Sequence, residues 1–171
     1  LLALVLGFIY NSFVSSKAQL DEGWSGIDVQ LKRRYDLIPQ LVEIVNAYVK
    51  NEGDILTNVA RLRSESMSEN NLEKKASLED QISQDVRKIS VSVEAYPQLK
   101  SADNFLNLMN QLFEIEDQIQ LSRRYYNGTV RNFNIKIKTF PNNLFAGVFG
   151  FKEADFFEAS DEAKSDVKVQ L

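Results

Sequence analysis

The chain of 171 residues contains no cysteine and no histidine. Without cysteine there are no disulfides, and without either residue type a Cys/His zinc site is excluded. The absence of histidine also excludes Ser-His-Asp and Cys-His catalysis, and the Glu-x-x-His ligand pairs of di-iron helical bundles. We therefore expect neither a metal site nor a bound cofactor.

Glycine and proline are also scarce, with seven and three residues respectively. Because few residues interrupt the long periodic segments, an all-α class is favoured, and this length suits one domain with a core. The net charge is −4, whereas domains that bind nucleic acids are usually basic. We therefore expect no nucleic-acid partner.

The segment that organises the chain runs from Ser25 to Tyr48. Its apolar residues recur at alternating steps of three and four, which is typical of one face of an α-helix. They are Leu20, Trp24, Ile27, Leu31, Tyr35, Ile38, Leu41 or Val42, Val45, and Tyr48 or Val49. The pattern predicts a helix over residues 3–51. Pro39 removes the donor for the Tyr35 carbonyl, so a kink is expected there.

Three further helices are predicted downstream. Gly53 is interpreted as the stop of the first helix and Asp54 as the N-cap of the second, which ends near Met67. The third spans residues 71–95, and Ser101 is expected to cap the fourth. The inward residues of the third are Leu72, Leu78 or Lys75, Ile82, Val86, Ile89 and Val93; those of the fourth are Phe105, Leu108, Leu112, Ile115, Ile119, Tyr126, Val130, Phe133 and Ile137.

The turns at 51–54, 68–71 and 96–101 are short, which favours an antiparallel up-and-down bundle of four main helices over residues 13–140. Residues 133–138 alternate between apolar and polar, as a strand would. We keep them helical because an isolated strand would have no partner.

The first residues, Leu1–Ile9, are apolar and uncharged. They are too few to cross a bilayer, which takes about 20 residues. Because the chain begins with Leu, we interpret residues 1–12 as the C-terminal part of an N-terminal membrane anchor, with Tyr10 at the interface. A buried or interfacial helix start is the alternative. The basic residues that follow favour a cytoplasmic body by the positive-inside rule.

The C-terminal segment, residues 141–171, is first aromatic and then acidic. We expect its aromatic part to pack on or beside the bundle. Alternatively, it forms a hydrophobic surface patch for a partner or for the membrane interface.

A dense charged group follows the start of the organising segment: Asp28, Lys32, Arg33, Arg34 and Asp36. One interpretation is a solvated face with exchangeable ion pairs. A second places Arg34 beside the apolar seam, where it fixes helix register by pairing with Glu114, Glu116 or Asp117. A third is a site for an anionic peptide or lipid head group near the carbonyl freed by Pro39.

A second basic group, Arg123 and Arg124 with Arg131, lies among tyrosines. Arginine interleaved with aromatics can stack nucleobases, but helical spacing places Tyr126 in the core with the arginines around it. The neighbouring acids Glu114, Glu116 and Asp117 spread over one helix turn without a helper base. We therefore expect no catalytic residue and no enzyme.

Several blocks of the chain match a known family. The block W-S-G-I-D-V-Q-L-K-R-R-Y-D-L-I-P-Q-L-V-E is followed in order by Tyr96–Lys100, Arg123–Asn127, Val130–Asn134 and Phe140-Pro141. Together they resemble the LemA family of bacterial membrane-anchored helical proteins. The resemblance implies a helical bundle behind an N-terminal membrane helix, with no established biochemical activity. LemA-like proteins are typically described as membrane-associated, in cell-envelope settings near membrane proteases.

These observations predict a single-pass cell-membrane protein whose helical bundle is a scaffold or interaction module for a protein partner. The expected interaction surface comprises Asp28, Lys32, Arg33, Arg34, Asp36, Arg123 and Arg124. The alternative is a binding module for an anionic peptide or lipid head group at Lys32, Arg33 and Arg34 near Pro39.

Overall fold

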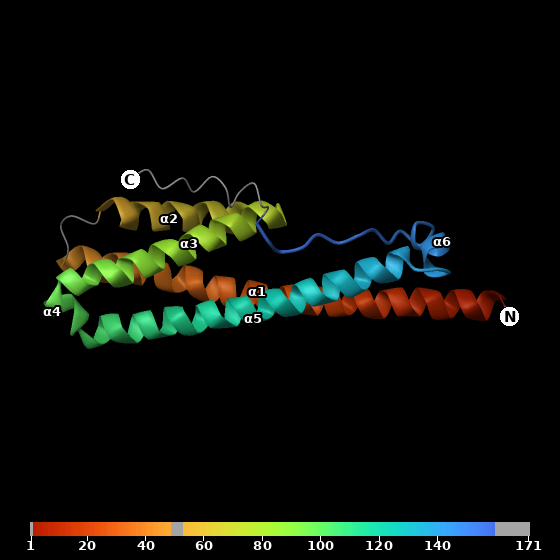
Figure 1. The fold of residues 1–171 in the computed structure, drawn as a ribbon, viewed down its shortest axis with the longest axis horizontal. Coiled ribbons are helices and arrows are strands. Elements are labelled where there is room, and N and C mark those ends of the chain that lie inside the picture. Colours follow the sequence, from red (N-terminus) through yellow and green to blue (C-terminus); the bar gives the residue numbers. More distant parts are fainter. Residues whose placement is uncertain (1, 49–52, 160–171) are drawn as a thin grey trace. The chain divides into compact units, whose positions relative to one another are not determined.

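The computed structural model describes residues 2–48 and 53–159, and within these ranges all regular structure is helical (Figure 1). The predicted all-α class is confirmed. The chain divides into two compact units. Unit 1 comprises Leu1–Val29 and Gln120–Phe156, and unit 2 comprises Gln30–Ile119 and Phe157–Leu171. Helices α1 (Leu2–Tyr48) and α5 (Asp103–Lys138) are long enough to contribute to both units.

Unit 2 contains the second half of α1, then α2 (Gly53–Ser68), α3 (Leu72–Ser92), the 3-10 helix η1 (Val93–Ala95), α4 (Pro97–Lys100) and the first half of α5. Its interior is a continuous apolar cluster drawn from all these helices. The cluster consists of Ile38, Leu41, Val45, Leu56, Val59, Leu62, Ile82, Val86, Ile89, Val93, Leu99, Phe105, Leu108, Met109 and Leu112. Removal of these side chains from water is the main stabilising term for this unit.

The apolar seam predicted for α1 is confirmed. Its fully buried members are Leu20, Ile27, Leu31, Tyr35, Ile38, Leu41 and Val45, whereas Trp24 is half-buried and Tyr48 is exposed. The predicted end at residue 51, and Val49 as an alternative seam position, lie outside the described residues. Helical spacing alone therefore located the face of α1 that packs inward.

Pro39 lies inside α1, as predicted, and the helix continues through it. Proline has no N–H, so the Tyr35 carbonyl loses its usual helical donor. Arg63 on α2 replaces that donor, because its Nε lies 2.6 Å from the Tyr35 oxygen. The bend expected at this point stays a prediction.

Several predicted helix ends are wrong. Gly53 and Asp54 lie in the first turn of α2 and do not precede it. Ser101 does not cap α5, since its hydroxyl bonds the Gln98 carbonyl. The short helix α4 was not predicted, because Pro97 was interpreted only as the end of the preceding helix. At the first position of a helix the missing N–H of proline costs no hydrogen bond, so Pro97 can also start α4. The cap of α3 is Asn71, whose side chain accepts from the Lys74 N–H at 2.9 Å.

Unit 1 has an aromatic interior. Phe13 of α1 stacks on Phe151 with ring centroids 4.8 Å apart, and Phe133 of α5 meets the same ring edge-on at 6.4 Å. Trp24 meets Tyr126 edge-on at 5.6 Å. Aromatic pairs of this geometry contribute about 0.5–1.5 kcal/mol each beyond area burial. Part of the aromatic tail thus packs on α1 and α5 within this unit.

The chain after α5 returns along that helix as an irregular segment, residues 151–156. Asn134 holds it with two hydrogen bonds, from Nδ2 to the Ala154 carbonyl at 2.9 Å and from the Ala154 N–H to Oδ1 at 2.8 Å. The Tyr126 hydroxyl donates to the Asp155 carbonyl at 3.0 Å. Residues 133–138 are helical, as predicted, whereas the short helix α6 (Asn142–Ala146) was not foreseen.

None of the helices in the described ranges combines the length and the apolar character needed to cross a membrane.

Candidate functional site

Arg34 is the largest charged side chain buried in unit 2. It lies on α1 beside the seam residues Leu31 and Ile38, and its exposed fraction is 2%. A guanidinium is rarely buried in this way unless charged partners surround it. Its contacts therefore define the candidate site.

Two carboxylates from different helices bind Arg34. Its Nη2 forms an ion pair with Glu79 of α3, and its Nη1 lies 2.7 Å from Glu116 of α5. The hydroxyl of Ser83 on α3 bonds both members of the second pair: it accepts from Arg34 Nη1 at 2.8 Å and donates to Glu116 at 2.6 Å. Arg34 thus links α1 to both α3 and α5.

The second oxygen of Glu79 accepts hydrogen bonds from the hydroxyls of Tyr35 and Ser66, whose oxygens are 2.9 Å apart. Ser66 lies on α2 and is fully buried. We call the set Arg34, Tyr35, Ser66, Glu79, Ser83 and Glu116 the polar network. It takes a residue from each of the four helices α1, α2, α3 and α5 in unit 2.

The polar network combines one guanidinium and two carboxylates with three hydroxyls. Burial raises the pKa of the Tyr35 phenol well above its ordinary value of 10.0, and the negative charge of Glu79 raises it further. Tyr35 therefore stays neutral and donates a hydrogen bond to the carboxylate. Removing Arg34 leaves buried carboxylate charge without its cation, which is strongly destabilising.

The cavity beside the polar network is small. It is lined by Arg34, Ser83, Arg87 and Glu116 with apolar neighbours from α3 and α5, and its volume is about 10 Å³. That is roughly the room required for one water molecule. The carboxylate oxygens of Glu79 and one carboxylate oxygen of Glu116 are already engaged by Arg34 and by hydroxyls. In the described ranges, no three acidic side chains are grouped to hold a metal ion.

The remaining predicted surface residues occupy other positions. Lys32, Arg33 and Asp36 are exposed, and Arg33 donates to the Gln30 side chain at 3.0 Å. Asp28 is half-buried in unit 1, as is Arg123, while Arg124 is exposed. The inclusion of Arg34 in this surface is wrong, because that side chain is in the interior, where two acids compensate its charge.

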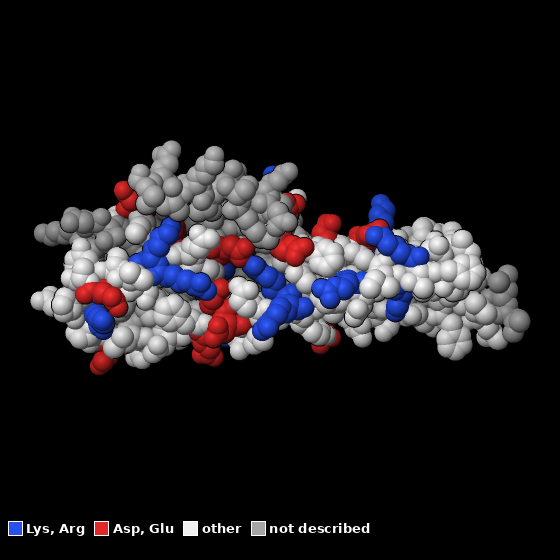
Figure 2. Space-filling model, viewed as in Figure 1, with Lys and Arg blue, Asp and Glu red and all other residues white. Residues whose placement is uncertain are grey.

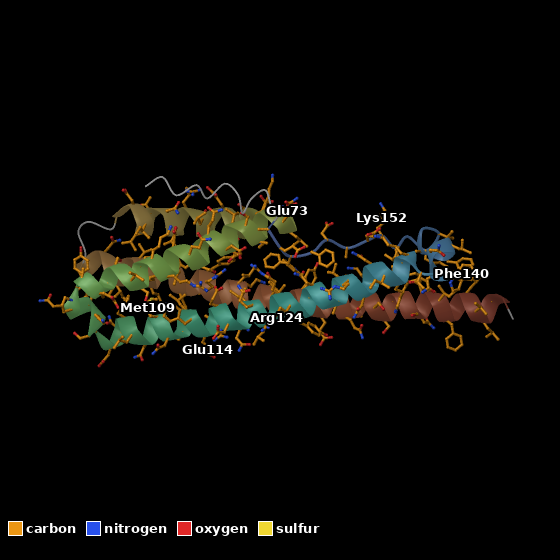
Figure 3. The ribbon with its side chains drawn as sticks, viewed as in Figure 1. Glu73, Met109, Glu114, Arg124, Phe140 and Lys152 are labelled. Atoms are coloured by element: carbon orange, nitrogen blue, oxygen red, sulfur yellow. The ribbon has the colours of Figure 1, made fainter. Side chains whose placement is uncertain are left out.

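The hypothesis that Arg34 pairs with an acid on another helix is confirmed for Glu116. Glu114 and Asp117, the other two candidates, are exposed, and Glu114 lies on the outer side of α5 (Figure 3). Glu79 was not predicted; Leu78 or Lys75 was expected to point inward at this turn of α3. A signal was present: Glu79 lies three residues before Ile82, so the seam through Ile82, Val86 and Ile89 extends back to it.

The residues of the polar network lie in a part of the sequence that is similar to known proteins. The sequence model of the LemA family matches residues 23–171. The chain belongs to the LemA family. It is similar to Protein LemA of Metamycoplasma hominis, with 27% identity over 96% of this chain and 78% of that protein.

The chain is also similar to magnetosome proteins. It is 25% identical to Magnetosome protein MamQ 2 of Paramagnetospirillum magneticum over 87% of this chain, and 23% identical to Magnetosome protein MamQ of Magnetospirillum gryphiswaldense over 86%. The chain spans 64% of the length of each of these two relatives. The LemA match contains every member of the polar network.

Proposed function

We propose that this LemA-family protein is a membrane-associated helical scaffold whose exposed helix faces bind a protein partner. The N-terminal part of α1 belongs to a single membrane-spanning anchor, and the body is cytoplasmic. The protein has no catalytic activity of its own.

The start of α1 carries this proposal. No charged residue occurs before Lys17, and several large apolar side chains on the first turns face solvent. Leu4 is 69% exposed and Phe8 is 80% exposed. Such exposure is costly in water, whereas it is favourable when these turns contact lipid. Membership of the LemA family supports the same conclusion.

The structure of unit 2 favours a scaffold over a ligand-binding module. An anionic ligand near Pro39 was expected to use Arg34 and the carbonyl freed by the proline. Arg34 is neutralised by Glu79 and Glu116, and Arg63 occupies the Tyr35 carbonyl. Lys32 and Arg33 remain at the surface and suit contact with a protein.

The proposal is tested by chemical crosslinking in intact cells, followed by membrane fractionation and mass spectrometry. Arg33→Glu is the test variant. Its matched control is Arg61→Glu, which reverses an equally exposed arginine on α2 of the same unit. Arg34→Glu is unsuitable because it disrupts the interior.

We expect the protein in the membrane fraction, crosslinked to a specific protein that Arg33→Glu loses and Arg61→Glu retains. Crosslinking to no other protein would overturn the proposed scaffold function. Recovery of the protein outside the membrane fraction would overturn the proposed membrane anchor.

A further inference from the structure

We infer that unit 1 has a second membrane contact, formed by the turns around α6, which lie in the interfacial layer of the same bilayer as the start of α1. We call residues 139–151 the apolar turns. This inference rests on the proposed membrane attachment of α1. It assigns the lipid bilayer as the occupant of a surface whose role the fold leaves open.

The apolar turns expose large hydrophobic side chains and carry no charge. Phe140 is 75% exposed, Leu144 is 59% exposed and Val148 is 79% exposed. From Thr139 to Phe151 the sequence contains no acidic or basic residue. A surface of this kind is unfavourable in water and marks a site of interaction.

Contacts with Tyr10 fix the position of the apolar turns along α1. The ring of Phe149 lies 5.3 Å from that of Tyr10, and the ring of Phe151 lies 6.1 Å away. Tyrosine is enriched where lipid head groups meet acyl chains. Helix geometry of 1.5 Å per residue places Leu2–Ile9 over about 12 Å beyond Tyr10. If these residues enter lipid, the apolar turns lie at interfacial depth.

Lysines mark the edge of this surface on both chain segments. The uncharged start of α1 ends at Lys17, and the apolar turns are preceded by Lys138 and followed by Lys152. Phe140 and Lys152 are labelled in Figure 3, and Figure 2 shows the visible face of this end of unit 1 without charged side chains. Glu153 is the nearest acid beyond the turns, and Lys138 pairs with it at 2.8 Å.

This charge boundary favours a bilayer over a protein partner. Lysines extend their aliphatic stems along apolar surface and place the ammonium group among head groups. Two segments far apart in sequence both change from uncharged to basic beyond Tyr10: α1 at Lys17, about 10 Å along the helix, and the chain after the apolar turns at Lys152. Lys136 joins the two segments on this side of Tyr10, since its ammonium donates to the Ser12 carbonyl at 3.0 Å. A planar interface accounts for charges that begin on the same side of Tyr10 in both segments.

The test uses site-specific fluorescence. The chain has no cysteine, so one introduced cysteine carries one environment-sensitive nitrobenzoxadiazole label. The three labelled variants are Phe8→Cys in the first turns of α1, Val148→Cys in the apolar turns and Val91→Cys on α3. Val91 is the matched control, because it is 69% exposed and belongs to unit 2.

On addition of vesicles of phosphatidylcholine and phosphatidylglycerol, the labels at positions 8 and 148 should shift to the blue and brighten several-fold. The label at 91 should not change. A response at 8 without one at 148 overturns this inference and leaves the proposed anchor intact. No response at either position overturns both. A concentration-dependent response at 148 without vesicles indicates a second copy of the chain and also overturns the inference.

A second measurement uses unlabelled protein. The pair Leu144→Ser and Val148→Ser should weaken binding to the same vesicles roughly tenfold, because two apolar side chains no longer enter the interface. The control pair, Met67→Ser and Val91→Ser, removes comparably exposed side chains from unit 2 and should leave the affinity unchanged. Equal losses for the two pairs would contradict a specific role of the apolar turns.

Discussion

Different kinds of contact hold the long helices together in the two units. Unit 2 places a guanidinium, two carboxylates and three hydroxyls beside a large apolar core. Unit 1 is held by aromatic contacts and by the Asn134 and Tyr126 hydrogen bonds to the irregular segment. Most of the exposed large hydrophobic side chains also belong to unit 1.

The two units differ in how strictly their contacts determine the register of the packed helices. An apolar interface tolerates a helix that slides or rotates, whereas the polar network is satisfied in one register alone, since each partner is stranded in any other. The helices of unit 2 are therefore fixed in one register, whereas unit 1 carries exposed apolar surfaces of the kind that bind a partner.

The largest effect is expected from Arg34→Met. The substitution leaves Glu79 and Glu116 without a cation, so the free energy of unfolding should fall by about 3–5 kcal/mol. Urea denaturation measures this loss, and hydrogen exchange should show weakened protection in α3. The control is Arg33→Met, an exposed neighbour, which should change stability by less than about 0.5 kcal/mol.

Adding Glu79→Met to Arg34→Met tests this explanation, because it also removes the more deeply buried of the two carboxylates left without a cation. The double variant should recover part of the lost stability, since a buried ion pair is replaceable by apolar side chains. Equal urea midpoints for Arg34→Met and Arg33→Met would show that the polar network is not required.

A smaller effect is expected from Arg63→Met. The Tyr35 carbonyl, already without its helical donor at Pro39, then has no replacement, and a buried unpaired acceptor costs about 1–3 kcal/mol. The same denaturation experiment on Arg61→Met, an exposed arginine two residues earlier, should show almost no change. If both variants lose the same amount, the carbonyl contact is irrelevant to stability.

Two glycines of α1 provide a matched test within unit 1. A Cβ at Gly26 would meet Ser122 at 3.8 Å, an ordinary contact, whereas a Cβ at Gly23 would lie 3.3 Å from the Tyr126 backbone. Gly26→Ala should stabilise the protein by about 0.5–1 kcal/mol through helix propensity. Gly23→Ala should lose that gain because α5 must move. Thermal unfolding distinguishes the two, and equal gains would rule out tight packing at Gly23.

The smallest effect is on the pH dependence of stability, and it should appear in both units. Burial raises the pKa of Tyr126 to about 12 and that of Tyr35 further, so the folded protein keeps these protons at pH values where the unfolded chain releases them. This contribution to stability is complete below pH 10 and is lost as the pH rises above it. Urea unfolding between pH 8 and 11 should show the decline, and Tyr35→Phe or Tyr126→Phe should flatten it. An unchanged slope in both variants would contradict this assignment.

Sequence patterns predicted what depends on local spacing. The seam of α1 and the inward face of α5 follow a helical period, so residues such as Ile27, Leu112 and Phe133 could be assigned to the core. The spacing of Glu79 from Ile82 also fits the seam of α3, but acidic residues are usually exposed. Its pairing with Arg34, 45 positions away, has no local pattern that could predict it. Helix α6 has five residues, too few to show a period.

The polar network also bears on how the chain folds. Arg34 is separated from Glu79 by 45 residues and from Glu116 by 82. The Tyr35 carbonyl accepts its hydrogen bond from Arg63, 28 residues later. Helix α1 thus cannot satisfy its own polar groups, and an intermediate in which it has docked on one helix alone lacks some of the hydrogen-bond partners of Arg34 and Tyr35. Such partly assembled states are disfavoured, so α2, α3 and the first half of α5 should assemble on α1 in one cooperative step.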